Sequence, residues 1–490
     1  MQVKSTKDYT IDDMDFKAIN FGKADAHTEG ESFPELLSKG YLNISSVAEK
    51  AMNGNVFLFL GYKGSGKSSL SEHLRLQYGE EVVDQQQLKD FPFREFDKIL
   101  DTDDKIIRYK KLWNWILCVK VFGNLYADSS STIQTQENIK KVINIFTQAG
   151  MFPVMKISSL VKKNVSDSVK ATIECLELSR TESRENVMVD IELLTDYIKQ
   201  LILSFKEENS HVMVIDDLDD ILSPKGLQFG IISALINAIK ELNRFFALNS
   251  IPFKILVLCR TDMFERLPDP NKNKIKQDNS FTFTWYREGI NKSEDSDLIA
   301  LINTRAKLVY PEIEDVFASF FPQRYDKKKT YSALLDFTRH TPRDFIQLIN
   351  HIQEQCPENT EKVSSSCIEK GIKEYSTEYF KQEISDEMSG YLPGPVIEGI
   401  FNALSSMRSR EFEYDEFKEK CRYNTRLKDF DLDEVMKVLY ECSAIGHIYS
   451  YDGGYTNRVT FKYRNRSSTF NPDDRIMLHK GLWKALNVNY

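Results

Sequence analysis

The segment Val56-Phe57-Leu58-Phe59-Leu60-Gly61-Tyr62-Lys63-Gly64-Ser65-Gly66-Lys67-Ser68-Ser69 decides the fold of this chain. It holds the pattern G-x-x-x-x-G-K-[ST] between an apolar strand and a helical stretch at 69–78, which is the setting that a phosphate-binding loop requires. Its glycines permit positive φ, so we expect the loop to turn its N–H groups inward around a phosphate. The pattern therefore predicts a nucleoside triphosphate site, whose expected contacts are Gly61, Lys63, Gly64, Ser65, Gly66, Lys67, Ser68 and Ser69.

Two side chains at the end of this loop have separate expected roles. Lys67 would neutralise the β- and γ-phosphates of ATP, and the Ser68 hydroxyl would bind Mg²⁺. A glycine turn that caps an ordinary helix is the alternative interpretation, and the flanking strand disfavours it. ATP and Mg²⁺ are accordingly the predicted cofactors.

A second apolar run, Val212-Met213-Val214-Ile215, ends in a series of acidic residues that begins with Asp216 and Asp217. A buried parallel strand consists of continuous aliphatic residues, and its carboxyl end faces the ligand crevice of an open α/β sheet. We therefore expect Asp216 to bind Mg²⁺ through water and Asp217 to act as the base that orients the attacking water. An acidic turn on a solvated surface is the alternative, which the phosphate loop makes less favourable.

A third apolar run, residues 253–259, ends in Arg260-Thr261-Asp262, and an amphipathic helix at 227–248 separates it from the acidic strand. Strand, helix and strand in this order indicate a parallel sheet and hence an α/β phosphate-loop NTPase core. Arg260 is a candidate sensor of the γ-phosphate. It is equally a candidate for an ordinary salt bridge at the end of a strand.

Composition limits the class of protein. The 490 residues suffice for about three domains. A net charge of −8 argues against a surface that coats nucleic acid, although it leaves room for one basic patch. Seven scattered cysteines without a C-x-x-C pair indicate reduced thiols. With no apolar run of membrane-spanning length and no secretory h-region, we expect a cytoplasmic protein without a membrane partner.

The order of patterns along the chain predicts four regions. Residues 1–50 form a polar lead-in, and residues 51–290 form the ATPase core with a helical insertion at about 100–190, since about 149 residues separate Lys67 from Asp216. Short helices separated by proline and charged turns at 291–389 indicate an all-α lid. Three helices followed by a hairpin at 390–490 indicate a C-terminal winged-helix domain.

One arginine of the predicted lid and four basic residues of the predicted wing each have more than one interpretation. Arg343 follows Thr341-Pro342 on the first turn of a helix, the place from which an arginine of lid-bearing ATPases reaches the γ-phosphate; the alternative is that it only caps the lid surface. The predicted wing carries Arg458, Lys462, Arg464 and Arg466, which suit DNA phosphates, an acidic protein partner or plain solvation.

These motifs together resemble a STAND or origin-recognition-type ATPase of the AAA+ superfamily. The chain is most similar to a bacterial group of P-loop ATPases with an F-G-x-x-x-A lead-in, here Phe21 to Ala26, and an H-x-x-L-W-x-A-L ending, here His479 to Leu486. The resemblance implies a place among bacterial antiviral systems. Asp217 stands where the superfamily commonly has Glu, and its shorter reach implies slow hydrolysis and a switch rather than a motor.

Two hypotheses about function remain at this stage. In the first, a regulatory ATPase uses its nucleotide state to control a partner effector or its own homo-oligomer. In the second, a DNA-binding AAA+ ATPase clasps a duplex between lid and winged helix. The acidic net charge favours the first hypothesis. The sequence shows no L-S-G-G-Q segment of a transporter ATPase and no nuclease or protease constellation.

Overall fold

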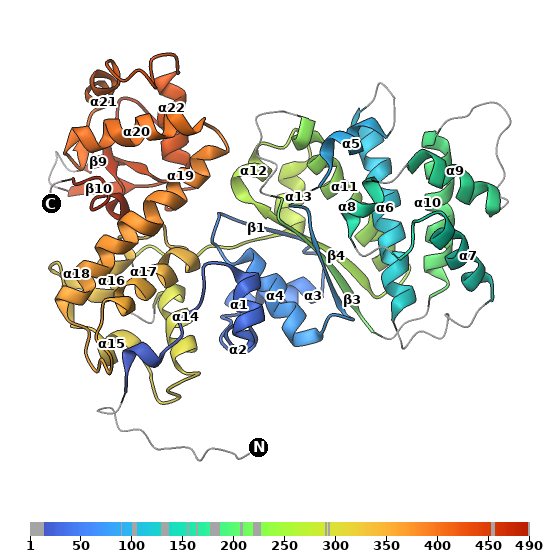
Figure 1. Ribbon diagram of the computed structural model, residues 1–490, viewed down its shortest axis with the longest axis horizontal. Coiled ribbons are helices and arrows are strands. Elements are labelled where there is room, and N and C mark those ends of the chain that lie inside the picture. Colours follow the sequence, from blue (N-terminus) through green and yellow to red (C-terminus); the bar gives the residue numbers. More distant parts are fainter. Residues whose placement is uncertain are drawn as a thin grey trace. The chain divides into compact units, whose positions relative to one another are not determined.

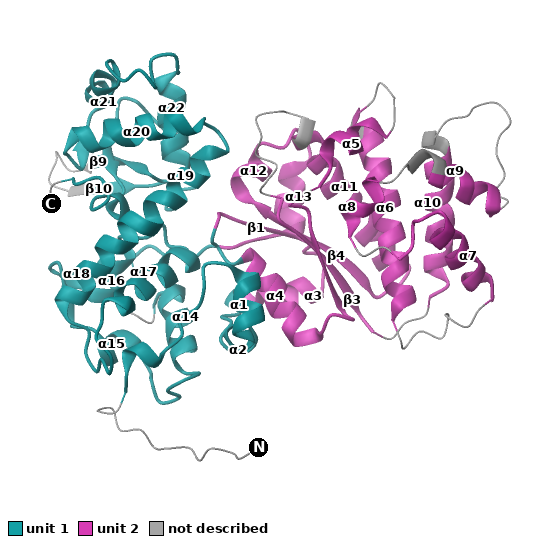
Figure 2. Cartoon of the chain, viewed as in Figure 1, with its two compact units in different colours: residues 1–44, 64–66, 284–490 teal, residues 45–63, 67–283 magenta. Residues whose placement is uncertain are grey.

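The computed structural model describes residues 14–89, 91–99, 105–128, 137–153, 156–162, 165–176, 187–205, 209–218, 227–289, 292, 295–451 and 456–488. They belong to two compact units, which Figure 2 shows in different colours. The sheet unit combines residues 45–63 with residues 67–283, and the helical unit combines residues 1–44, 64–66 and 284–490. The three residues at the tip of the phosphate loop thus group with the helical unit.

The sheet unit is built on five parallel strands in the order β2-β3-β4-β1-β5 (Figure 1). Strands β1, β3 and β4 are buried almost throughout, because helices cover both faces of the sheet. This arrangement confirms the predicted α/β class. The strands are β1 (Leu58–Gly61), β2 (Val83–Gln87), β3 (His211–Asp216), β4 (Phe253–Arg260) and β5 (Ser280–Thr282).

Helices α4 (Lys67–Tyr78) and α11 (Leu227–Leu248) pack against the sheet, and Figure 1 shows them on opposite faces. Helix α4 begins at the phosphate-loop lysine, and α11 occupies the residues predicted from its periodicity. The other elements outside the insertion are η3 (Ile44–Ser46), α3 (Val47–Met52), α12 (Thr261–Glu265) and α13 (Lys272–Asn279).

A series of helices separates β2 from β3, where the sequence predicts a helical insertion. Helix α6 packs against α10 and α11, and the Trp113 indole N–H donates to the Ile231 carbonyl at 3.0 Å. Trp113 and Trp115 are fully buried, as expected for core residues. The helices are α5 (Phe93–Lys98), α6 (Lys105–Ala127), α7 (Glu137–Gln148), α8 (Ile157–Val161), α9 (Val165–Cys175) and α10 (Val187–Leu203).

The predicted polar lead-in at 1–50 is folded over its described part. Phe16 and Phe21 are buried in the core of the helical unit, and the Phe16 ring lies 5.3 Å from the Phe320 ring. Gly22 has φ +116°, and a Cβ there would overlap the buried ion pair between Arg305 and Glu29. The sequence did not predict that this segment packs into the core, because its aromatic residues are sparse and lack helical spacing. The segment contains η2 (Phe16–Ala18), α1 (Ala26–Ser32) and α2 (Pro34–Ser38).

The lid region is helical, as predicted. Helices α14, α16 and α17 match the short helices that the sequence predicts at 296–308, 331–338 and 342–355. The continuous run α18-η7-α19, whose middle turn is a π-helix, has no counterpart among the predicted helices. The elements are α14 (Asp297–Ala306), α15 (Val316–Phe320), β6 (Arg324–Tyr325), β7 (Lys328–Lys329), α16 (Thr330–Leu335), α17 (Pro342–Glu354), α18 (Ser365–Glu374), η7 (Tyr375–Phe380) and α19 (Lys381–Ser389).

Residues 390–488 form the C-terminal module, with the three predicted helices and the predicted hairpin β9-β10. The two remaining strands of its sheet, ordered β10-β9-β11-β8, are too short to give a sequence signal. Residues 452–455, between β9 and β10, lie outside the described residues. The elements are α20 (Gly394–Met407), β8 (Glu411–Phe412), α21 (Tyr414–Cys421), α22 (Leu432–Glu441), β9 (Ile445–Tyr451), β10 (Thr456–Thr460), β11 (Arg475–Leu478) and η9 (Lys480–Leu482).

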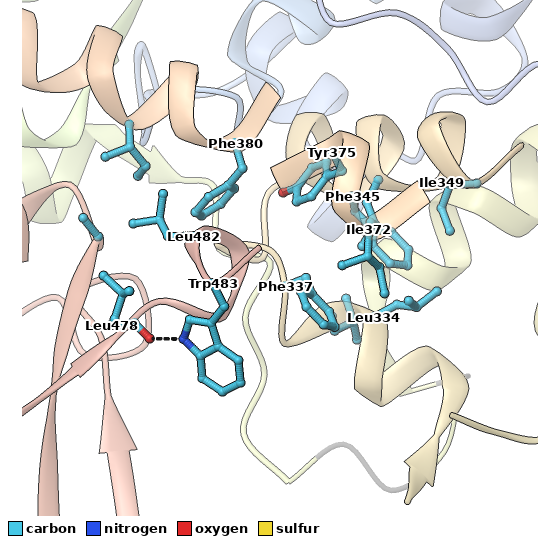
Figure 3. Close-up of a cluster of buried hydrophobic side chains, with 14 of the residues drawn as sticks. Leu334, Phe337, Phe345, Ile349, Ile372, Tyr375, Phe380, Leu478, Leu482 and Trp483 are labelled. Atoms are coloured by element: carbon cyan, nitrogen blue, oxygen red, sulfur yellow. Dashed lines mark hydrogen bonds between the residues drawn. The ribbon is translucent and has the colours of Figure 1, made fainter. Parts of the chain in front are cut away.

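One hydrophobic core runs across the predicted boundary between lid and C-terminal module. Figure 3 shows Leu482 and Trp483 of the module beside Phe380 and Tyr375 of the lid region. A Cβ at Gly481 would lie 2.6 Å from the Phe337 carbonyl oxygen, so these backbones approach as closely as glycine allows. The lid and the module therefore fold as parts of one unit. Among the described residues, no helix has the length and hydropathy needed to cross a membrane.

Candidate nucleotide site

The phosphate loop has the geometry that its glycines predict, with one exception. Gly64 and Gly66 adopt φ of +78° and +91°, which exposes consecutive backbone amides for an anion. Gly61 was expected to share this conformation. It instead ends strand β1 in extended backbone and is in register with Arg260 of β4. The expectation for Gly61 was wrong because ladder pairing to β4 holds this residue in the sheet.

Lys67 is the buried cation of the loop. Its Nζ donates to the carbonyl oxygens of Gly61 and Tyr62 at 3.1 Å each. These bonds curl the side chain back over the loop, and the contact of the ammonium with β- and γ-phosphates stays a prediction. Ser68 and Ser69 follow it on the first turn of α4 and are half-buried. Lys63 is also half-buried, within the loop itself.

Asp216 is the last residue of β3 and is buried. Its Oδ1 accepts the Asp217 backbone N–H at 2.8 Å, while Oδ2 has no hydrogen-bond partner at normal distance among the described residues. Burial, and then the charge of Asp217, raise the pKa of Asp216 to about 6, against the lowering effects of the Asp217 N–H, the Ser68 hydroxyl and Lys67. A buried carboxyl with one unsatisfied oxygen near a serine hydroxyl and an ammonium fits a hydrated Mg²⁺.

Asp217 follows the strand in the left-handed region, with φ +57°. Aspartate is among the few residues that tolerate this conformation, and such backbone strain gathers at functional sites. Strand β3 ends at Asp216, so Asp217 is the first residue after the strand. Asp219 and Asp220, the other acids of the series, lie outside the described residues.

Arg260 ends strand β4, which lies between β1 with the phosphate loop and β3 with Asp216. Its guanidinium makes a two-pronged contact with Asp262, from Nε to Oδ1 at 3.0 Å and from Nη2 to Oδ2 at 2.7 Å. The structure therefore contains the strand-end salt bridge that was the alternative for this residue. Arg260 nevertheless lies at the carboxyl end of the parallel strands, where the sensor was expected. Beside it, the buried Thr261 Oγ1 has no hydrogen-bond partner among the described residues.

Arg343 is the second residue of α17, after the N-cap Thr341 and Pro342. Its backbone N–H donates to the Gly64 carbonyl at 3.3 Å, so this helix turn contacts the tip of the phosphate loop within the helical unit. The guanidinium is partly exposed, with Nη1 3.8 Å from Glu383 Oε2. Arg343 therefore lies next to the loop tip at Gly64, and its role toward the γ-phosphate stays a prediction.

The sequence analysis missed two features of this region. The Trp285 indole N–H donates to the Ser65 carbonyl at 2.9 Å, and no spacing rule connects the two residues. Arg339 makes a buried pair with Asp344 through two 2.9 Å hydrogen bonds and donates to Glu387 at 2.6 Å. Burial would raise the pKa of Asp344, but Arg339 holds it below the usual value. The arginine in Thr338-Arg339-His340 gave no distinct signal, since its partners Asp344 and Glu387 lie 5 and 48 positions away in the sequence.

Comparison with known proteins matches one segment to a family and most of the chain to solved structures. Residues 296–382, which lie in the lid region, match the family described as FunZ-associated C-terminal helical domain. The chain is similar to the Orc1 protein of Aeropyrum pernix, solved in complex with DNA, at 12% identity over 93% of this chain and 94% of that chain, with a TM-score of 0.38. It is similar to Cdc6p from Pyrobaculum aerophilum at 12% identity over 90% and 92%, with a TM-score of 0.31.

Proposed function

We propose that this chain binds Mg²⁺–ATP and hydrolyses it slowly, as a regulatory switch. One observation carries the proposal: Lys67 and Asp216, both buried, lie close enough for the Lys67 ammonium to lower the pKa of the Asp216 carboxyl, whose Oδ2 is unsatisfied among the described residues. Buried polar atoms are normally paired, so an unsatisfied carboxylate oxygen within the electrostatic range of an ammonium favours a site built for a ligand. The Lys67 ammonium would pair with the negative charge of a phosphate, and the Asp216 carboxylate would pair with the positive charge of the divalent cation.

Each residue has a distinct part in this proposal. The amides at Gly64 and Gly66 and the Lys67 ammonium hold the phosphates, while Ser68 and Asp216 hold Mg²⁺, which supplies charge neutralisation. Asp217 accepts the proton of the attacking water. Aspartate is one methylene shorter than glutamate, and a base that reaches the water less well supports slow turnover.

Nucleotide binding by Lys67→Ala tests the proposal. We expect no measurable binding of ATP or ADP by isothermal titration calorimetry, because the variant lacks the buried cation at the phosphates. Lys254→Ala is a matched control, since Lys254 Nζ also donates to two backbone carbonyls, of Lys50 and Asn53, at 2.9 and 3.0 Å. It should lose comparable structural bonds and keep its affinity. Wild-type affinity in Lys67→Ala would refute the proposal.

A protein partner suits the C-terminal module better than DNA does. Helix α22, which precedes the hairpin, exposes Asp433 and Glu434 beside Lys437. On the wing, Lys462 pairs with Glu441 at 2.9 Å, and the Arg464 guanidinium packs over the Tyr463 ring. Lys462 and Arg464, two of the four basic residues predicted to hold phosphate, are thus engaged inside the module, and acidic groups would oppose a DNA backbone.

We therefore infer a protein effector or a second copy of the chain as the partner, in the cytoplasm, with bacterial antiviral defence as the setting implied by the resemblance. The second candidate is a DNA-binding AAA+ ATPase that clasps a duplex with the lid and a winged helix. It is supported by the order of three helices and a hairpin in the module. A gel shift with duplex DNA decides between them: binding that falls steeply with salt would favour the second candidate.

A further inference from the structure

Trp285 contacts the backbone of the phosphate loop directly. Its indole Nε1–H donates to the Ser65 carbonyl at 2.9 Å, and its Cζ2 lies 3.9 Å from the position of a Cβ at Gly66. The side chain is 7% exposed. A second donor, the Arg343 backbone N–H, bonds the Gly64 carbonyl at 3.3 Å. Two consecutive carbonyls of the loop are therefore held by donors from residues far away in the sequence.

These bonds fix the direction of the amides that a phosphate needs. In a trans peptide the C=O and the following N–H point to opposite sides of the chain. The Ser65 carbonyl shares its peptide plane with the Gly66 N–H, and the Gly64 carbonyl shares its plane with the Ser65 N–H. Holding both carbonyls toward Trp285 and Arg343 turns both N–H groups the other way, into the nest that would receive the phosphate.

We propose that Trp285 is a positioning residue for the nucleotide, which holds the Gly66 N–H toward the phosphates through its bond to the Ser65 carbonyl. The inference rests on the proposed function, because it assigns a role in the same site. Glycine-rich loops are conformationally free, and ordering the loop before the ligand arrives reduces the entropy that binding must offset.

The residues that follow Trp285 contact other residues of the helical unit. The Tyr286 ring lies 5.1 Å from the buried His340 ring and 6.0 Å from the Tyr463 ring. Arg287 pairs with Asp297 at 2.8 Å, and Glu288 pairs with Arg458 at 2.6 Å. Three successive residues after Trp285 therefore have partners within the helical unit, and one of these partners, His340, is buried.

Trp285→Phe tests the proposal, because it keeps an aromatic ring and removes the N–H. We expect the affinity for ADP, measured by isothermal titration calorimetry, to fall about two- to tenfold, the range for one neutral hydrogen bond. Trp483→Phe is the matched control. The Trp483 indole N–H also donates to a carbonyl, that of Leu478, at 2.9 Å, and Trp483 is 8% exposed. Neither residue belongs to the phosphate loop. Trp483→Phe should lose similar thermal stability and keep its affinity.

The outcomes separate this inference from the proposed function. Unchanged affinity in Trp285→Phe, with binding abolished in Lys67→Ala, would overturn the role of Trp285 alone. Unchanged affinity in both variants would overturn the nucleotide site itself. An equal loss in Trp285→Phe and Trp483→Phe would show general destabilisation and also overturn the positioning role.

If Trp285→Phe does not fold, hydrogen exchange on the wild-type chain provides a second measurement. ADP should protect peptides that cover 64–66 and 283–289 together, because the hydrogen bond joins them. Protection of the loop without any change at 283–289 would overturn the proposal.

Discussion

The pKa of Asp216 leads to a sharp prediction about Mg²⁺. With a pKa of about 6, the carboxyl is about 91% ionised at pH 7 and about 9% ionised at pH 5, since each pH unit changes the ionisation ratio tenfold. Mg²⁺ binds the ionised form, so protons compete with it. We expect the gain in ADP affinity on adding Mg²⁺ to fall about tenfold between pH 7 and pH 5, and about half a proton to be released per Mg²⁺ at pH 6.

Isothermal titration calorimetry with ADP, with and without Mg²⁺, measures both quantities when the runs are repeated in buffers of different ionisation enthalpy. Free ADP also gains protons as the pH falls, and this effect is the same for the wild type and for a variant. Asp216→Asn therefore provides the reference that corrects for it. This variant should show a small Mg²⁺ gain that changes with pH only as the free nucleotide does. The same pH profile in the wild type and in Asp216→Asn would refute the assignment of Asp216 as the Mg²⁺ carboxylate.

Three further predictions concern the base, the lid and two buried histidines. Asp217→Asn should keep Mg²⁺–ATP binding and slow phosphate release by roughly a hundredfold or more; an unchanged steady-state rate would exclude Asp217 as the base. Arg343→Ala keeps its backbone N–H to Gly64, so it should bind ADP normally, but it should bind ATP no better than ADP and lose ATP-dependent hydrogen-exchange protection at 300–350. Full protection there would make Arg260 the better sensor. Burial lowers the pKa of both His340 and His479 to about 3. Below about pH 6.5 the unfolded chain therefore binds more protons than the folded chain, and stability against urea should fall as the pH drops. The loss should be up to about 1.4 kcal/mol per pH unit for each imidazole. His340→Asn, which tolerates the positive φ of this position, should remove its share of that slope between pH 7 and 5, and an unchanged slope would contradict the buried neutral state.

Local chemistry explains why the nucleotide site could be predicted from the sequence. The phosphate loop takes its form from glycine φ values within a few residues, and the structure shows them at Gly64 and Gly66. Asp216 ends its strand where continuous aliphatic residues give way to acids. Helix α11 spans the residues that its 3.6-residue periodicity indicated. In each case the decisive interactions are short-range, so the pattern carries the information.

The role of a polar side chain at a given position depended instead on which distant groups reach it. Trp285 meets Ser65 across 220 positions of the sequence, and no periodicity encodes that contact. Arg464 looks like a basic wing residue in the sequence, yet it packs over the Tyr463 ring inside the module. Phe16 belongs to an apparently polar lead-in and is fully buried. The sequence by itself determined the phosphate loop, the acidic strand and the α/β class, because backbone geometry and burial patterns are local. Only the tertiary structure decided which charges are paired and which rings are covered, because desolvation and hydrogen bonding depend on groups that folding brings together.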